Sequence, residues 1–244
     1  MKILAIDTTA VTAAAALVED GHILGTYQQN GTLTHSETML NMVENLLANA
    51  HVTAADLDLL AVSAGPGSFT GVRIGVSIIK GLAFAKDIPC VPVSTLDALS
   101  ENLRPMAEAL GHDFYVCPVM DARRSQVYCA LFLYETDAAG NTVKTRILED
   151  DMLSAAELSE RLSALQLPVL FVGEGCRVTQ KEIHLPHCKE APEAVRYQNG
   201  VSVASAALAV YEAAEDKSVF SDLLLKPTYL RPSQAERERA EKQG

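Results

Sequence analysis

One order of elements occurs twice in this chain of 244 residues, and it constrains the fold more than any other feature. Each copy reads as a three-stranded meander, then a helix, then a short apolar strand. The first copy predicts strands at 2–7, 12–19 and 22–29, a helix at about 35–49 and a strand at 57–63. The second copy predicts strands at 114–121, 126–134 and 142–149, a helix at 154–164 and a strand at 168–173. Repetition of one supersecondary unit indicates an internal duplication, and so a two-subdomain α/β protein.

Local signals support these elements and set the domain boundaries. Asp20-Gly21 is a residue pair that two-residue hairpins favour, and Ser154 with Glu157 three residues later is typical of a helix start. We place the boundary within the helical stretch 95–111. The prediction is a first subdomain at 1–105, a second at 106–215 that includes a last helix near 200–214, and a C-terminal segment at 216–244. That segment is expected to return to the first subdomain and to end in a flexible, charged tail.

Composition and charge exclude several classes of protein. The net charge is −11, from 20 Lys plus Arg against 31 Asp plus Glu. A protein that binds nucleic acid by itself normally carries a basic face, so RNA is expected to be gripped mainly by something else. Five scattered cysteines without a C-x-x-C pair are typical of a reducing compartment. Asp7 interrupts the first apolar run too early for a signal peptide, and no stretch is long enough to cross a membrane. We therefore expect a cytoplasmic protein.

Two strands end in an acid followed by a tight turn, Asp7-Thr8-Thr9 and Asp121-Ala122-Arg123. This arrangement resembles the two phosphate loops of the actin, Hsp70 and sugar-kinase superfamily. Those loops need glycine, because only a backbone without Cβ approaches a phosphate closely. Thr9 and Arg123 stand where glycine is expected. One interpretation is therefore a vestigial nucleotide site at Asp7, Thr8, Thr9, Asp121 and Arg123; the other is that both acids only terminate strands or cap turns.

A glycine-rich string, residues 65–75, lies between a predicted strand and a predicted helix. It lacks the lysine of a Walker A loop. It is no nucleophile elbow either, since Pro66 and Thr70 stand where that motif around Ser68 requires glycine. The string predicts either a sharp turn, with Ser68 or Thr70 capping the helix, or a surface shaped for close contact.

The two helices of the first copy, at 35–49 and 70–86, have broader apolar faces than one sheet needs. One face of each covers its own sheet, and a second apolar face is typical of an interaction site unless both helices are wholly internal. Small residues spaced four apart along 70–86 allow another helix to approach closely. The predicted contact residues are His35, Met39, Met42, Val43, Leu46, Thr70, Gly71, Arg73, Ile74, Ser77, Ile78 and Gly81. Without a partner, such a patch predicts a homodimer.

Catalytic and metal-binding patterns are poor. His35 has no second histidine four residues later, and the spacing of His184, His187 and Cys188 matches no zinc pattern. No Ser/His/Asp or Cys/His set can be assembled. We predict no metal site and no catalytic residue. Arginines at 123–124 and 231 could bind a carboxylate or phosphate, or stand in solvated turns.

These features together resemble the TsaB (YeaZ) family, which takes part in making N6-threonylcarbamoyladenosine (t6A) in tRNA. The matching motifs are 5–8, 34–37, 65–75, 121–124 and 229–232, and the resemblance runs nearly end to end. It implies an actin-like ATPase (ASKHA) fold with a degenerate nucleotide site. It also implies a heterodimer with TsaD through a bundle of the first two helices, recruitment of the ATPase TsaE, and contact with tRNA only through the complex. No cofactor is required, although residual ATP or ADP could lie at the subunit junction.

Three functions follow for testing. The first is a non-catalytic subunit that stabilises and activates TsaD. The second is an ATP-dependent phosphotransferase of the same fold, which needs the phosphate grip that Thr9 and Arg123 spoil. The third is a glycoprotease-like peptidase, for which no nucleophile and base can be found.

Overall fold

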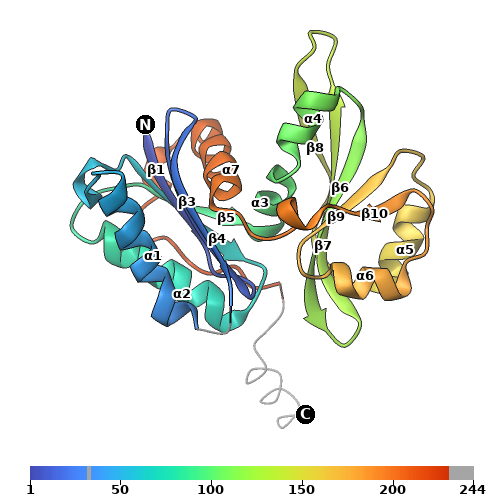
Figure 1. Ribbon diagram of the computed structural model, residues 1–244, viewed down its shortest axis with the longest axis horizontal. Helices are drawn as coiled ribbons and strands as arrows, with labels where there is room; N and C mark the ends of the chain where they lie inside the picture. Colours follow the sequence, from blue (N-terminus) through green and yellow to red (C-terminus); the bar gives the residue numbers. More distant parts are fainter. Residues whose placement is uncertain (32–33, 231–244) are drawn as a thin grey trace.

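A computed structural model describes residues 1–31 and 34–230 and contains two five-stranded sheets side by side (Figure 1). The first sheet is built from β1 (Lys2–Asp7), β2 (Thr12–Glu19), β3 (His22–Asn30), β4 (Leu59–Gly65) and β5 (Cys90–Ser94). Its order is β3-β2-β1-β4-β5. The β1-β2 and β2-β3 pairs are antiparallel, and the β1-β4 and β4-β5 pairs are parallel. β1 and β2 are buried nearly throughout, because helices cover both faces of this sheet.

The second sheet repeats the topology of the first. It contains β6 (Phe114–Arg123), β7 (Gln126–Thr136), β8 (Thr142–Ser154), β9 (Val169–Val172) and β10 (Cys188–Glu190). Its order, β10-β9-β6-β7-β8, matches the first order strand for strand when read from the other end, with the same parallel and antiparallel pairs. The predicted duplication and the α/β fold class are confirmed.

Helices cover the first sheet on both faces. α1 (His35–Asn49) and α2 (Phe69–Ala83) pack on one face, and α7 (Gly200–Ala213) packs on the other (Figure 1). The buried residues of α7 share a core with β1, β2, β4 and β5 of the first sheet. A Cβ on Gly200 would lie 2.5 Å from the backbone of Ala15 and Ala16, so glycine permits this close packing. The predicted domain range 106–215 is therefore corrected: its last helix belongs to the first subdomain.

The second sheet is covered by shorter helices. α5 (Ala155–Ser163) and α6 (Cys176–Glu182) lie on one face, and α3 (Thr95–Glu101) and α4 (Arg104–Leu110) lie on the other. Within the described residues, single-turn 3-10 helices occur at Ala54–Asp56, Glu193–Val195 and Lys217–Val219. The predicted capping box of α5 is present, since Glu157 N donates a hydrogen bond to Ser154 Oγ at 3.2 Å and Ser154 N donates one to Glu157 Oε2 at 2.8 Å. It fixes the start of this helix at the predicted residue.

Most predicted elements are confirmed, with differences at their ends. The helix predicted over 70–86 ends at Ala83, because the chain turns extended at Phe84 and takes a left-handed conformation at Ala85. The strand predicted at 57–63 runs from Leu59 to Gly65. The sequence did not predict β5, α6 or β10.

The chain returns to the first subdomain after α7. Cys90 N donates to the carbonyl of Phe220 at 2.8 Å, and Thr228 N donates to the carbonyl of Ala64 at 2.7 Å. Leu225 is buried in the core between the first sheet and its helices. The segment therefore runs from the start of β5, at Phe220, to the end of β4, at Thr228. The predicted charged tail, 231–244, lies outside the residues that the structure describes.

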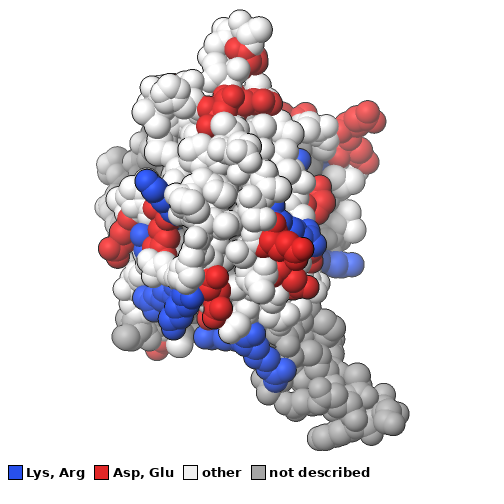
Figure 2. Space-filling view, turned by 90° about the vertical axis from the view of Figure 1, so that its right-hand side faces the viewer, with Lys and Arg blue, Asp and Glu red and all other residues white. Residues whose placement is uncertain are grey.

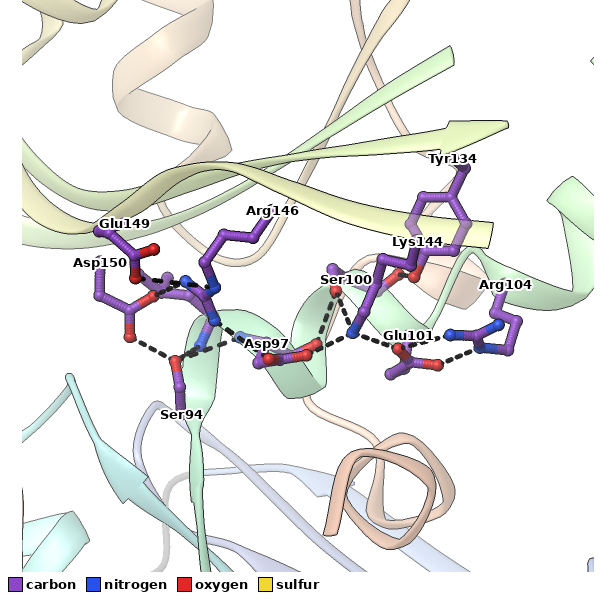
Figure 3. Close-up of polar contacts among 11 residues, drawn as sticks. Ser94, Asp97, Ser100, Glu101, Arg104, Tyr134, Lys144, Arg146, Glu149 and Asp150 are labelled. Atoms are coloured by element: carbon purple, nitrogen blue, oxygen red, sulfur yellow. Dashed lines mark hydrogen bonds and ion pairs between the residues drawn. The ribbon is translucent and has the colours of Figure 1, made fainter. Parts of the chain in front are cut away.

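A network of ion pairs joins the two subdomains (Figure 3). Lys144 on β8 bonds to both Asp97 and Glu101 of α3, and Arg146 Nη2 lies 3.0 Å from Asp97 Oδ2. Asp150 bonds to Arg146 on one side and to Ser94 at the end of β5 on the other. The side chains of Lys144 and Glu101 are only 15% and 4% exposed. Since α3 follows β5 directly, this clamp (Ser94, Asp97, Glu101, Lys144, Arg146 and Asp150) fixes the first subdomain to the long strand β8.

Candidate functional site

The loop after β1 turns inward. Asp7 Oδ1 accepts hydrogen bonds from Thr9 N at 2.8 Å and from Thr9 Oγ1 at 2.7 Å. All three side chains of the predicted loop, at 7–9, are buried. Burial raises the pKa of Asp7, although hydrogen bonds from Ser63 and Thr9 oppose the shift. Thr9 thus occupies the position of the missing glycine and bonds to the acid itself.

The glycine-rich string packs on this same loop. A Cβ on Gly71 would lie 2.0 Å from the carbonyl oxygen of Thr8, and one on Gly75 would lie 2.5 Å from Thr8 Oγ1. Thr8 Oγ1 in turn donates to the carbonyl of Gly71 at 2.8 Å. Both glycines are buried and let α2 lie against the end of β1. Gly71 is therefore removed from the predicted contact residues. Ser68 Oγ accepts a hydrogen bond from Gly71 N, so Ser68 caps α2, as the first of the two interpretations of the glycine-rich string predicted.

The loop after β6 turns outward instead. Asp121 Oδ1 accepts from Arg123 N at 2.7 Å, which is the same contact that Asp7 makes with Thr9. Arg123, Arg124 and Ser125 all have positive φ, at 70°, 56° and 57°. Three consecutive residues other than glycine rarely adopt this conformation, because their Cβ atoms crowd the backbone. The turn holds the Arg123 side chain, 85% exposed, at the mouth of the cleft between the subdomains.

Only the second of the two predicted loops lines the cleft between the subdomains. A cavity of about 220 Å³ is lined from the first subdomain by Val11, Thr12 and Asn30, and from the rest of the chain by Asp121, Arg123, Glu174, Arg177 and Tyr197. The structure thus brings Asp121 and Arg123 to the residues that follow the first loop. Asp7 is close enough to raise the pKa of Glu174.

Glu174 is a residue that the sequence analysis missed. It stands between Gly173 and Gly175 in the turn after β9, where a Cβ on Gly173 would lie 2.2 Å from the carbonyl oxygen of Val119. Burial raises the pKa of Glu174 to about 7, and the charges of Asp7 and Asp121 add to the shift. The duplication was the signal that could have found it, since this turn is the counterpart of the glycine-rich string after β4.

Four predicted contact residues of α1 lie inside the protein. Met39, Met42, Val43 and Leu46 are 0%, 7%, 1% and 3% exposed and belong to the core between the first sheet and its helices. A rigid partner cannot reach them, so we correct the predicted contact and leave them out. The outer face of α1 carries polar residues and one large apolar side chain that is exposed, Leu40, 46% exposed. His35 is half-buried, and its Nε2 lies within hydrogen-bonding distance of the carbonyl of Ala10.

The outer face of α2 is more apolar. Ile74, Ile78 and Leu82 are half-buried along this face, and Phe84, just after the helix, is 74% exposed. The other predicted contact residues here, Thr70, Arg73, Ser77 and Gly81, are exposed. A Cβ on Gly81 would meet no atom within 4 Å, so its backbone is open to approach. We define the α2 outer face as Ile74, Ser77, Ile78, Gly81, Leu82 and Phe84.

The outer surface of the second subdomain, on the side of the molecule away from the first sheet, carries charges of both signs. Figure 2 shows acidic and basic side chains interspersed over the outer surface of the second subdomain, with basic ones towards its lower edge and acidic ones towards its top. This view offers no continuous basic surface of the kind that RNA binding by itself needs. Within residues 1–31 and 34–230, no group of three or more His, Cys, Asp or Glu residues could hold a metal ion. No helix in the same ranges is long and apolar enough to cross a membrane.

Comparison with known proteins agrees with this architecture. A family model described as "TsaD: tRNA N6-adenosine threonylcarbamoyltransferase" matches residues 28–238. The tRNA threonylcarbamoyladenosine biosynthesis protein TsaB of Bacillus subtilis is 36% identical over 173 residues, 71% of each chain. TsaB of Escherichia coli is 31% identical over 175 residues, 72% of each chain. The solved structure of YeaZ from Pseudomonas aeruginosa aligns with a TM-score of 0.71 at 24% identity, covering 94% of this chain and 99% of that one.

The duplicated five-stranded sheets, with a cleft between them, define a two-subdomain α/β protein. Within that class, the matches to TsaB sequences identify the family more narrowly. The chain belongs to the TsaB (YeaZ) family.

Proposed function

We propose that this chain is a non-catalytic subunit that binds TsaD and stabilises it in its active form for t6A modification of tRNA. The observation that carries the proposal is the α2 outer face, which is apolar and open at Gly81. Full burial of one large apolar side chain contributes roughly 1.5–3 kcal/mol, so Phe84 together with three half-buried aliphatic side chains offers several kcal/mol to a partner. The two TsaB relatives described above, both named as tRNA threonylcarbamoyladenosine biosynthesis proteins, support this role.

The cleft supports the non-catalytic part of the proposal. Thr9 fills the place of a phosphate-loop glycine and bonds to Asp7, while the Arg123 side chain lines the cavity. A phosphate needs backbone amides that it can approach closely, whereas the amides of Thr9 and Arg123 donate to Asp7 and Asp121. These residues do not fit the triphosphate of ATP, which speaks against a phosphotransferase. Binding of a nucleotide at the junction with TsaD and recruitment of TsaE stay predictions. Contact with tRNA only through the complex, and a location in the cytoplasm, also stay predictions.

Co-purification with TsaD of the same organism tests the proposal. The double variant Ile78→Glu/Phe84→Glu places two charges in the α2 outer face and should abolish co-purification, since an unpaired charge cannot be buried cheaply. Leu110→Glu is a matched control, because Leu110 is 54% exposed on α4 of the other subdomain. Circular dichroism should be unchanged in both variants. Retention of TsaD by the double variant at the level of the control would refute the mapped surface.

The same face predicts self-association in the absence of TsaD. Exposed apolar faces of one chain pair with each other through a two-fold axis, so the isolated protein should form a homodimer. Light scattering over a range of concentrations should show dimers for the wild-type chain and for Leu110→Glu. A wild-type protein that stays monomeric at high concentration would weaken the proposal.

A further inference from the structure

An arginine in the second turn of α2 lies against a pair of stacked aromatic rings. The guanidinium carbon of Arg73 lies 3.9 Å from the ring centroid of Phe69 and 5.9 Å from that of Tyr229. The two rings also stack on each other, with centroids 4.8 Å apart. Arg73 Nε donates a hydrogen bond to the Tyr229 hydroxyl at 2.8 Å. We call these three residues the arginine stack.

The C-terminal segment is built to deliver Tyr229 to this place. Thr228 N donates to the carbonyl of Ala64 at 2.7 Å, which fixes the segment beside the end of β4. Its path leaves no room for a side chain at Gly65, where a Cβ would lie 2.1 Å from the carbonyl oxygen of Thr228. Gly65 also has a φ of 122°, which favours glycine. Tyr229 is thus positioned by contacts between Gly65, in the glycine-rich string, and Thr228, which is more than half the chain away.

The guanidinium of Arg73 is oriented but not neutralised. No Asp or Glu pairs with it in the ranges 1–31 and 34–230, whereas Arg104, Arg146, Arg161 and Arg196 each have an acidic partner. The hydrogen bond to Tyr229 uses Nε only, so the two terminal nitrogens remain available. Stacking has already restricted the side chain, so a ligand would lose little further entropy on binding it.

We propose that the arginine stack is the charged anchor of the partner interface, and that Arg73 binds the carboxylate of an Asp or Glu side chain of TsaD. The inference rests on the proposed function, because it assumes that TsaD covers α2. The planar fork of arginine matches a carboxylate with two parallel hydrogen bonds. Ile74 and Ile78 of the α2 outer face follow on the same helix, and a buried arginine flanked by apolar contacts is typical of an interface hot spot.

Affinity for TsaD, measured by calorimetry with the full-length chain, tests the anchor. Arg73→Ala should weaken binding roughly 30-fold or more, the usual cost of truncating one member of a buried interfacial charge pair. Arg73→Lys should recover only part of this loss, because lysine lacks the fork. Tyr229→Phe keeps the ring and removes the hydroxyl, and should weaken binding about three- to ten-fold if Tyr229 orients Arg73. Arg161→Ala removes an exposed arginine of α5 in the second subdomain and should bind as wild type.

The outcomes separate the anchor from the surface. If Ile78→Glu/Phe84→Glu abolishes binding but Arg73→Ala binds as wild type, the surface is correct and the anchor is wrong. If neither affects binding, the proposed function itself fails. If Arg73→Ala leaves TsaD affinity intact but weakens binding of tRNA to the complex, the anion is an RNA phosphate and the inference is overturned. Wild-type affinity should fall more steeply with salt than that of Arg73→Ala.

Discussion

The clamp between the subdomains gives a prediction whose size follows from the structure. Lys144→Met keeps the aliphatic stem of Lys144 but removes the ammonium group that bonds to Asp97 and Glu101. Breaking a buried ion pair costs about 3–5 kcal/mol, and an exposed pair contributes at most ~1 kcal/mol. Lys144 and Glu101 are largely buried, but Arg146 still neutralises Asp97 and Arg104 still neutralises Glu101. We therefore expect an intermediate loss of about 2 kcal/mol in the free energy of unfolding.

Thermal unfolding monitored by circular dichroism measures this loss. For a chain of this size, about 2 kcal/mol corresponds to a decrease in Tm of roughly 4–8 °C. Lys86→Met is the matched control, since Lys86 is exposed and has no ion pair in the part of the chain that the structure describes. A Tm for Lys144→Met equal to that of Lys86→Met would show that the clamp does not stabilise the fold, and the reasoning would be wrong.

Two further predictions concern the ends of strands. Gly65→Ala should lower the Tm more than Gly140→Ala, because a Cβ at Gly65 collides with the backbone of Thr228. Gly140 is the control, since it also has a positive φ but lies in an exposed turn with no atom near its Cβ position. Equal losses of Tm would contradict the packing at Gly65. The pKa of Glu174 is raised from 4.5 to about 7, so between these values the folded state holds a proton that the unfolded chain has lost. Wild-type stability should consequently fall as pH rises through this window, and Glu174→Gln should reduce that fall in urea titrations at several pH values; an unchanged pH dependence would refute the assignment.

The elements that could be predicted from the sequence are those with local causes. The Ser154 capping box and the Asp20-Gly21 turn are set by residues within three positions of each other, and both occur. The duplication could also be predicted, because the order of strands and helices is written along the chain. β10 could not, since three residues of Cys, Lys and Glu carry no strand pattern and pair only because β9 is beside them.

Features that depend on distant segments could not be predicted. The helix at 200–213 has apolar or small side chains on nearly every side, so its sequence does not indicate which of the two sheets it packs against. The close contact of Gly200 with β2 places it on the first sheet. The wide apolar face of α1 predicted a second contact surface for the same reason. The sheet and α2 bury Val43, and Leu40 is the one large apolar side chain of α1 that stays exposed. Tyr229 stood out in the sequence only as part of a motif. Its pairing with Arg73 depends on the return of the C-terminal segment.

Hydrogen exchange on the complex with TsaD tests the central claim most directly, because it maps the covered surface without any substitution. The duplication supplies an internal control, since α5 and α6 are the counterparts of α1 and α2 in the second subdomain. Binding of TsaD should slow exchange along α2, from Phe69 to Phe84, and leave α5 and α6 unchanged. Slowing at α5 and α6 with none along α2 would contradict the account.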